Sequence, residues 1–129
     1  GGAARQAAAD GAGAPPEEGG IALINNRAEF DASMDGRVMV AMFSSPMCGP
    51  CLLVEPKIAE LQAEFADAGV KIVKLNLTPG ENVKELKPIF SEHEVKALPT
   101  FFVYKAGQVQ GRVSGARHEE VRQLIQGAL

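Results

Sequence analysis

The sequence predicts one α/β domain built on a twisted, mixed, five-stranded sheet with helices on both faces. Arg37 to Ser44 is a continuous apolar run, which is typical of a central strand buried on both faces of a sheet. Strand-like and helix-like apolar spacings alternate from Ile21 onward. Near the end, Thr100 to Lys105 and Gln108 to Val113 are expected to form an antiparallel hairpin, which makes the sheet mixed.

The domain is expected to begin with a short strand and a short helix. Ile21 to Asn25 is a brief apolar run, and Asn26 suits the N-cap of a helix that extends to about Met34. Phe30 and Met34 then lie four residues apart on one helix face. The central strand from Arg37 follows this helix.

A long helix is expected after the central strand, starting at the only two cysteines of the chain. Ile58, Leu61 and Phe65 recur in it at helical spacing. Pro56 predicts a kink, because its ring displaces a backbone hydrogen bond. Gly69 is expected to end this helix.

The second half of the domain repeats the alternation. Val70 to Leu77 is the next expected strand, followed by a turn at Thr78-Pro79-Gly80. A helix then places four apolar side chains on one face, namely Val83, Leu86, Ile89 and Phe90. In the hairpin, Ala106-Gly107 makes the turn, and Gly107 supplies a positive φ. Arg117 to Ala128 closes the chain as a helix whose apolar face carries Val121, Leu124, Ile125 and Ala128.

Composition divides the 129 residues into a loose segment and a domain. Residues 1–20 contain Gly, Ala, Pro and a few charges but no large apolar side chain, so we expect this segment to be disordered and the domain to span residues 21–129. The segment fits a linker from a longer protein, the remnant of a processed leader, or a cloning remnant. No secretory pattern follows Gly1, so we expect any targeting peptide to have been removed or never included.

Charge and hydropathy exclude several classes of function. The net charge of −3 comes from interspersed acids and bases, which gives no basic stripe for nucleic acid. The longest apolar run, Val38 to Phe43, is too short to cross a membrane. Two cysteines in one motif are not the framework of a disulfide-stapled secreted domain. We therefore expect a soluble protein in a reducing intracellular compartment.

The motif Cys48-Gly49-Pro50-Cys51 is the strongest functional signal. Two thiols at this spacing, at the start of a helix, can close a small disulfide ring, and the helix N-terminus stabilises a thiolate on the first sulfur. A zinc site is disfavoured, because only His93 and His118 remain as further Cys or His ligands and both are expected on the surface. A purely structural disulfide is also disfavoured, since so small a loop constrains the unfolded chain little.

Several spaced signatures make residues 21–129 resemble the thioredoxin family. Besides the cysteine motif, two of them are Pro56 in the active-site helix and Lys74-Leu75-Asn76 in the following strand. The others are Leu98-Pro99-Thr100, at the loop whose proline is cis in that family, and Gly107 and Gly115-Ala116, at the later glycine positions of the family. The resemblance implies a thioredoxin fold and the activity of a protein-disulfide reductase.

The resemblance also implies roles for the site residues. Cys48 would attack a disulfide of a target protein, and Cys51 would resolve the mixed disulfide, without a metal or another cofactor. Substrate contacts would come from Met47, Gly49, Pro50, Leu98, Pro99, Gly115 and Ala116. The implied partners are disulfide-containing target proteins and an upstream thiol reductase. The alternative that we weigh is a thioredoxin-fold adaptor or redox sensor with little turnover.

The chain departs from the family pattern near the motif. Met47 and Ser44 stand where the family usually has Trp, and Met42 stands where it usually has a buried Asp thought to deprotonate the second cysteine. The proton of Cys51 would then pass to water, to substrate, or to Lys74 or Glu55, and we predict slow resolution.

The segment between Asn76 and Pro99 is also longer than in the shortest thioredoxins, which predicts a longer helix around Glu81 to His93. Together with the missing Trp, this insert resembles the thioredoxin-like modules of chloroplast stress proteins. The resemblance implies a monomer that works in the cytoplasm or the chloroplast stroma.

Overall fold

The computed structural model describes residues 17–18 and 20–129. Its strands are β1 (Glu17–Glu18), β2 (Ile21–Leu23), β3 (Val38–Ser44), β4 (Lys71–Asn76), β5 (Thr100–Lys105) and β6 (Gln108–Ser114). Its helices are α2 (Arg27–Ala32), α3 (Gly49–Phe65), the 3₁₀ helix η2 (Ala66–Ala68), α4 (Val83–Glu92) and α5 (His118–Ala128). The element order expected from Ile21 onward is confirmed.

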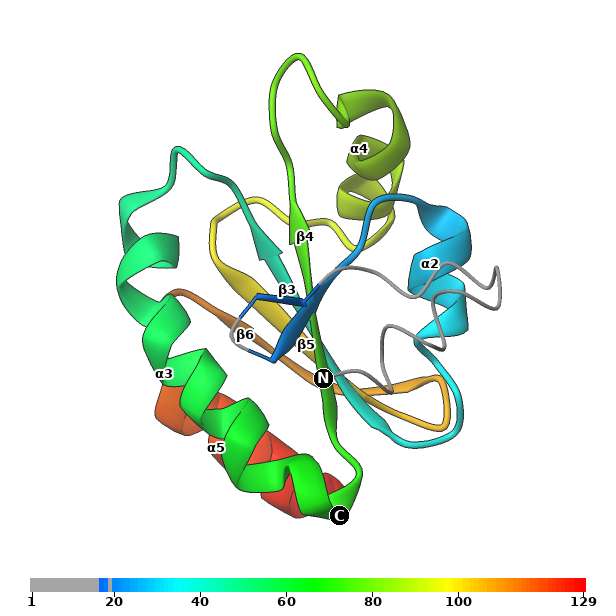
Figure 1. The fold of residues 1–129 in the computed structure, drawn as a ribbon, viewed down its shortest axis with the longest axis vertical. Helices are drawn as coiled ribbons and strands as arrows, with labels where there is room; N and C mark the ends of the chain where they lie inside the picture. Colours follow the sequence, from blue (N-terminus) through cyan, green and yellow to red (C-terminus); the bar gives the residue numbers. More distant parts are fainter. Residues whose placement is uncertain (1–16, 19) are drawn as a thin grey trace.

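The strands form one mixed sheet in the order β1-β2-β4-β3-β5-β6, with α3 and α5 on one face and α2 and α4 on the other (Figure 1). β2, β4 and β3 run parallel, whereas β5 is antiparallel to β3 and β6 to β5. The predicted mixed sheet between two helical layers is therefore confirmed.

A sixth strand, β1, of two residues joins the five expected strands at one edge of the sheet. Glu17 and Glu18 pair antiparallel with Ala22 and Ile21 of β2, although the sequence analysis placed them in the disordered segment. Strand pairing uses backbone groups and requires no apolar side chain, which is why composition did not reveal β1. Residues 1–16 and 19 of that segment lie outside the described residues, so the expected disorder and boundary remain predictions.

The strands bury two separate clusters because their side chains alternate between the two faces. All of β3 is buried: Val38, Val40 and Met42 face the cluster under α3 and α5. Met39, Ala41 and Phe43 face the cluster under α2 and α4. The burial expected on both faces of this strand is confirmed, with 1% of Met39 and 0% of Met42 exposed.

The helix boundaries follow local signals in the sequence. The side chain of Asn26 caps α2 by accepting a hydrogen bond of 2.9 Å from the backbone N–H of Glu29, as expected. Pro56 lies inside α3, and Gly69 ends η2 with a φ of +83°. In the β5–β6 turn, Gly107 has the expected positive φ.

The predicted apolar face of α4 is buried at Leu86, Ile89 and Phe90, whereas Val83, in the first turn of the helix, is 36% exposed. His93, which was expected on the surface, is partly buried. It is the C-cap of α4 and packs on aromatic side chains of β3 and β5. These residues are far apart in the sequence, so the sequence alone did not indicate this contact.

The His93 ring packs in a cluster that contains Phe30, Phe43, Phe102 and Tyr104. Its Nδ1 lies 2.7 Å from the carbonyl oxygen of Ile89, and its Nε2 contacts the Tyr104 hydroxyl. Burial, and secondarily the charge of Glu92, raises the pKa of Tyr104 above its usual value. This hydroxyl therefore remains protonated beside His93.

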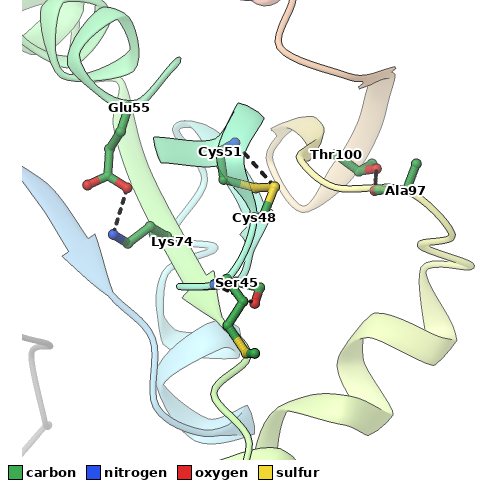
Figure 2. Close-up of a disulfide and its surroundings, with 8 residues drawn as sticks. Ser45, Cys48, Cys51, Glu55, Lys74, Ala97 and Thr100 are labelled. Atoms are coloured by element: carbon green, nitrogen blue, oxygen red, sulfur yellow. Dashed lines mark hydrogen bonds and ion pairs between the residues drawn. A yellow bond between two sulfur atoms is a disulfide. The ribbon is translucent and has the colours of Figure 1, made fainter. Parts of the chain in front are cut away.

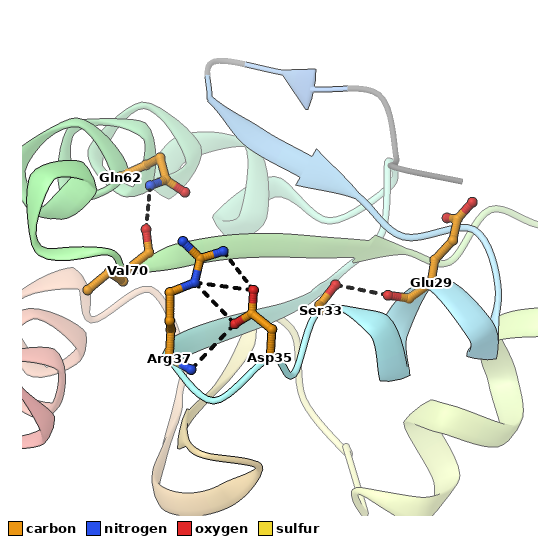
Figure 3. A network of polar contacts seen from close by, with 6 residues as sticks. All are labelled: Glu29, Ser33, Asp35, Arg37, Gln62 and Val70. Carbon is orange, nitrogen blue, oxygen red and sulfur yellow. Dashed lines mark hydrogen bonds and ion pairs between the residues drawn. The ribbon is translucent and has the colours of Figure 1, made fainter. Parts of the chain in front are cut away.

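A side chain of α3 completes the edge of β4. Among residues 17–18 and 20–129, β2 pairs with β4 only at Val73 and Lys74, and no other strand of this part of the chain pairs with the start of β4 on that side. Figure 3 shows Gln62 reaching the carbonyl of Val70, to which its Nε2 donates at 2.9 Å. Gln62 Oε1 also accepts from the backbone N–H of Ile72 at 2.7 Å. One amide side chain thus takes the place of a strand.

Candidate active site

Three chain segments meet at one end of the sheet because of strand register. The last pair of β3 and β5 joins Phe43 to Thr100, and Thr100 is opposite Ser114 of β6. The loops that follow Ser44, precede Thr100 and follow Ser114 therefore leave the sheet together. These loops contain the cysteines, Leu98-Pro99 and Gly115-Ala116, so the topology collects the predicted site residues.

Cys48 and Cys51 form a disulfide at the start of α3, with their Cα atoms 5.3 Å apart (Figure 2). Cys48 is the N-cap, and its Sγ accepts a hydrogen bond of 3.2 Å from the backbone N–H of Cys51. Cys48 is partly exposed, whereas Cys51 has 0% exposure. In the reduced pair this N–H and the helix N-terminus would stabilise a thiolate on Cys48.

The Leu98–Pro99 peptide is cis, as the resemblance implied. Thr100 Oγ1 donates to the carbonyl of Ala97 at 2.6 Å, and the backbone N–H of Gly115 donates to the carbonyl of Pro99 at 2.7 Å. These bonds fix the Leu98-Pro99 loop against the Gly115 loop. Leu98 and Cys48 pack, partly buried, against the same core cluster, whereas Ala116 is exposed.

Exposed apolar side chains surround the cysteines. Met47 is 79% exposed, beside the exposed Gly49 and Pro50. Leu52 and Leu53 are 57% and 81% exposed, and the sequence analysis did not select them. Their positions off the helix face of Ile58, Leu61 and Phe65 were a usable signal, because apolar residues on a solvent face often mark a binding surface.

A groove of about 290 Å³ extends from Leu98 toward α4. Its other lining residues are Leu77, Lys87, Phe90, Ser91, Val95 and Lys96. Of these residues, Leu98 had been predicted to contact substrate, and the packing of α4 on the sheet brings the others beside it. The groove is apolar with two lysines among its lining residues.

An ion pair lies under the first turns of α3. Lys74 Nζ is 2.9 Å from Glu55 Oε2, and the Lys74 side chain is 5% exposed while that of Glu55 is 28% exposed (Figure 2). Lys74 neighbours Met42 in the β3–β4 register. The structure thus pairs the two residues that the sequence analysis named as separate proton acceptors for Cys51.

Over the described residues, no cluster of three or more His, Cys, Asp or Glu side chains is arranged to hold a metal ion. In the same part of the chain, no helix combines the length and apolarity needed to cross a membrane.

Comparison with known proteins matches residues 22–127 to the thioredoxin family model. A thioredoxin H-type of Oryza sativa subsp. indica is 33% identical over 114 residues, covering 84% of this chain and 87% of the relative. Thioredoxin H9 of Arabidopsis thaliana is 33% identical over 112 residues, covering 83% of this chain and 74% of the relative. The crystal structure of the thioredoxin NaTrxh from Nicotiana alata matches with a TM-score of 0.72 and 29% identity, covering 90% of this chain and 98% of that one.

The family match spans the whole α/β unit, and the paired cysteines lie within it at the start of α3. The chain therefore belongs to the thioredoxin family and is a thiol-disulfide oxidoreductase.

Proposed function

We propose that the chain reduces target-protein disulfides, with Cys48 as the attacking thiolate and Cys51 as the resolving thiol. The observation that carries this assignment is the unequal exposure of the two cysteines, because Cys48 is partly exposed to a target and Cys51 is fully buried. The N-cap position of Cys48 adds the electrostatic stabilisation that an attacking thiolate needs.

The reaction is a double exchange. The Cys48 thiolate attacks one sulfur of the target disulfide, and the other target sulfur leaves as a thiolate that takes up a proton. The thiolate of Cys51 then attacks Cys48 Sγ, and the second target sulfur leaves. The target gains two electrons, and the Cys48–Cys51 disulfide holds the oxidised state until an upstream thiol reductase reduces it.

The target segment would lie across the exposed apolar surface. Met47, Gly49 and Pro50 flank Cys48, and the backbone of Leu98 offers pairing groups beside it. Pro99, Gly115 and Ala116 would complete the other wall, and the groove beyond Leu98 would take an apolar side chain of the target. Since every one of these residues comes from a single chain, we propose that the monomer is active.

We also propose a reducing intracellular compartment, such as the cytoplasm or the chloroplast stroma, as the working environment. A dithiol that acts as a reductant is favoured in such a compartment, where thiols are kept reduced. No observation favours the adaptor or sensor alternative.

The test is reduction of insulin disulfides driven by dithiothreitol, with wild type, Cys48→Ser and Cys51→Ser compared. Wild type should turn over above the dithiothreitol background, Cys48→Ser should not, and Cys51→Ser should accumulate a mixed disulfide with insulin. Equal background rates in all three folded proteins would overturn the reductase assignment.

A further inference from the structure

We propose that Glu55 is the proton acceptor for Cys51 when Cys51 resolves the mixed disulfide, and that Lys74 positions the Glu55 carboxylate for this step. The inference rests on the proposed roles of Cys48 and Cys51. It selects one of the acceptors that the sequence left open and assigns the Glu55–Lys74 ion pair a place in the reaction.

Burial of Cys51 creates the need for such a group. A thiol must lose its proton before it attacks a disulfide, because the thiolate is the nucleophile. Cys51 has 0% exposure and belongs to the core cluster that also contains Met42, Val54 and Ile58. Bulk water therefore has no direct access to its proton, and these apolar neighbours offer no acceptor.

Glu55 is placed to connect this thiol with solvent. It follows Cys51 by four residues on α3, so the two side chains lie on the same helix face one turn apart. Its 28% exposed side chain reaches toward β4 at the boundary between the core and water (Figure 2). A carboxylate there can take a proton from Cys51, directly or through one water molecule, and release it to solvent.

Lys74 fixes the carboxylate from the opposite side. Ile72 and Met42 face the cluster under α3, and Lys74 shares that face by strand alternation and register. Its ammonium lies 2.9 Å from Glu55 Oε2. A protonated lysine has no lone pair, so the acceptor of this pair is Glu55. The positive charge of Lys74 beside the helix also favours the thiolate that forms on Cys51.

Resolution of the mixed disulfide by Cys51 combines a proton transfer with an exchange of sulfur bonds. The S–H proton of Cys51 moves to a Glu55 oxygen, and the Cys51 thiolate forms a bond to Cys48 Sγ. The bond between Cys48 Sγ and the target sulfur breaks, and its electron pair leaves with the target thiolate, which takes up a proton from solvent. Glu55 then releases its proton to water.

Other charged groups near this helix turn have different surroundings. Lys57, two residues after Glu55, lies 3.9 Å from Glu60, and both side chains are more than half exposed, at 54% and 66%. Strand β2, the other neighbour of β4, has only Ile21, Ala22 and Leu23 and hence no titratable side chain. Glu60 therefore provides a matched control: a carboxylate on the same helix that is paired with a lysine but exposed.

The experiment follows reaction of the reduced protein with the aromatic disulfide dithiobis(nitrobenzoate) by stopped flow. Attack by Cys48 releases one coloured thiolate, and attack by Cys51 on the resulting mixed disulfide releases the second. Wild type, Glu55→Gln, Glu55→Asp and Glu60→Gln are compared across the neutral pH range, with urea unfolding as a check on folding.

We expect Glu55→Gln to slow the second release about tenfold or more while leaving the first unchanged, since a positioned base contributes at least that much. Its second rate should rise steadily with pH, because hydroxide or water must then take the proton. Glu55→Asp should restore part of the rate, and Glu60→Gln should behave like wild type.

Two results would overturn the proposal. One is a folded Glu55→Gln variant with the wild-type second rate and pH profile. The other is an equal slowing of both releases, which would indicate a purely structural role for the ion pair. Failure of the reductase assignment appears separately, as absence of insulin reduction by wild type.

Discussion

Removal of the Gln62 amide should destabilise the fold more than the same substitution at an exposed glutamine. Gln62→Met keeps the length of the side chain but removes both hydrogen bonds to β4, at 2.9 Å to Val70 and 2.7 Å to Ile72. An unsatisfied buried backbone group costs about 1–3 kcal/mol. Because Gln62 is only partly buried and water can reach part of the site, we expect a total loss of about 2–4 kcal/mol.

The assay is urea unfolding of the oxidised protein, with the free energy of unfolding obtained by linear extrapolation. Gln110→Met is the matched control, since the Gln110 amide donates only to the Gln108 carbonyl on the exposed edge of β6. This control should lie within about 0.5 kcal/mol of wild type. The reasoning is refuted if Gln62→Met is as stable as Gln110→Met, because the edge of β4 would then need no partner from α3.

Two further predictions concern the surface. Met47 is 79% exposed beside Cys48, and Met47→Gln should lower kcat/KM for insulin about fivefold, because about 1 kcal/mol of apolar contact is lost. The kcat/KM for the small substrate hydroxyethyl disulfide should stay unchanged. An equal loss for both substrates would contradict a role of Met47 in docking the target protein. Asp35→Asn should cost up to about 1 kcal/mol at neutral pH, because hydrogen bonding to Arg37 lowers the pKa of Asp35 and this ion pair is exposed. A carboxyl whose pKa is lowered by folding stabilises the fold at pH values above its pKa in the unfolded chain, and this stabilisation is lost as the pH falls. The difference in unfolding free energy between Asp35→Asn and wild type should therefore shrink below about pH 4. A difference independent of pH would count against the pairing.

Local signals in the sequence predicted most of the elements. The apolar run of β3, the N-cap at Asn26 and the glycine at Gly69 each act within a few residues, so their effects are visible without the fold. The Cys48–Cys51 pair is equally local, because its spacing alone allows ring closure.

Features that depend on tertiary contacts were missed or left open. β1 forms through backbone groups, and His93 packs on aromatic residues from distant strands. Glu55 and Lys74 could be named as candidates, but their pairing depends on how α3 crosses β4. Gln62 gave no signal, since a polar residue in an amphipathic helix is ordinarily a solvent-facing one.

The unequal exposure of Cys48 and Cys51 also limits what the protein can become attached to. A dithiol with two accessible sulfurs could capture one protein on each and bridge them into a covalent network. With the roles proposed above, only the Cys48 sulfur would meet a partner, and the Cys51 sulfur would react only inward, with the bond that holds that partner. Each capture would then end either in reversal or in release, so the protein would not serve as a cross-link between two others.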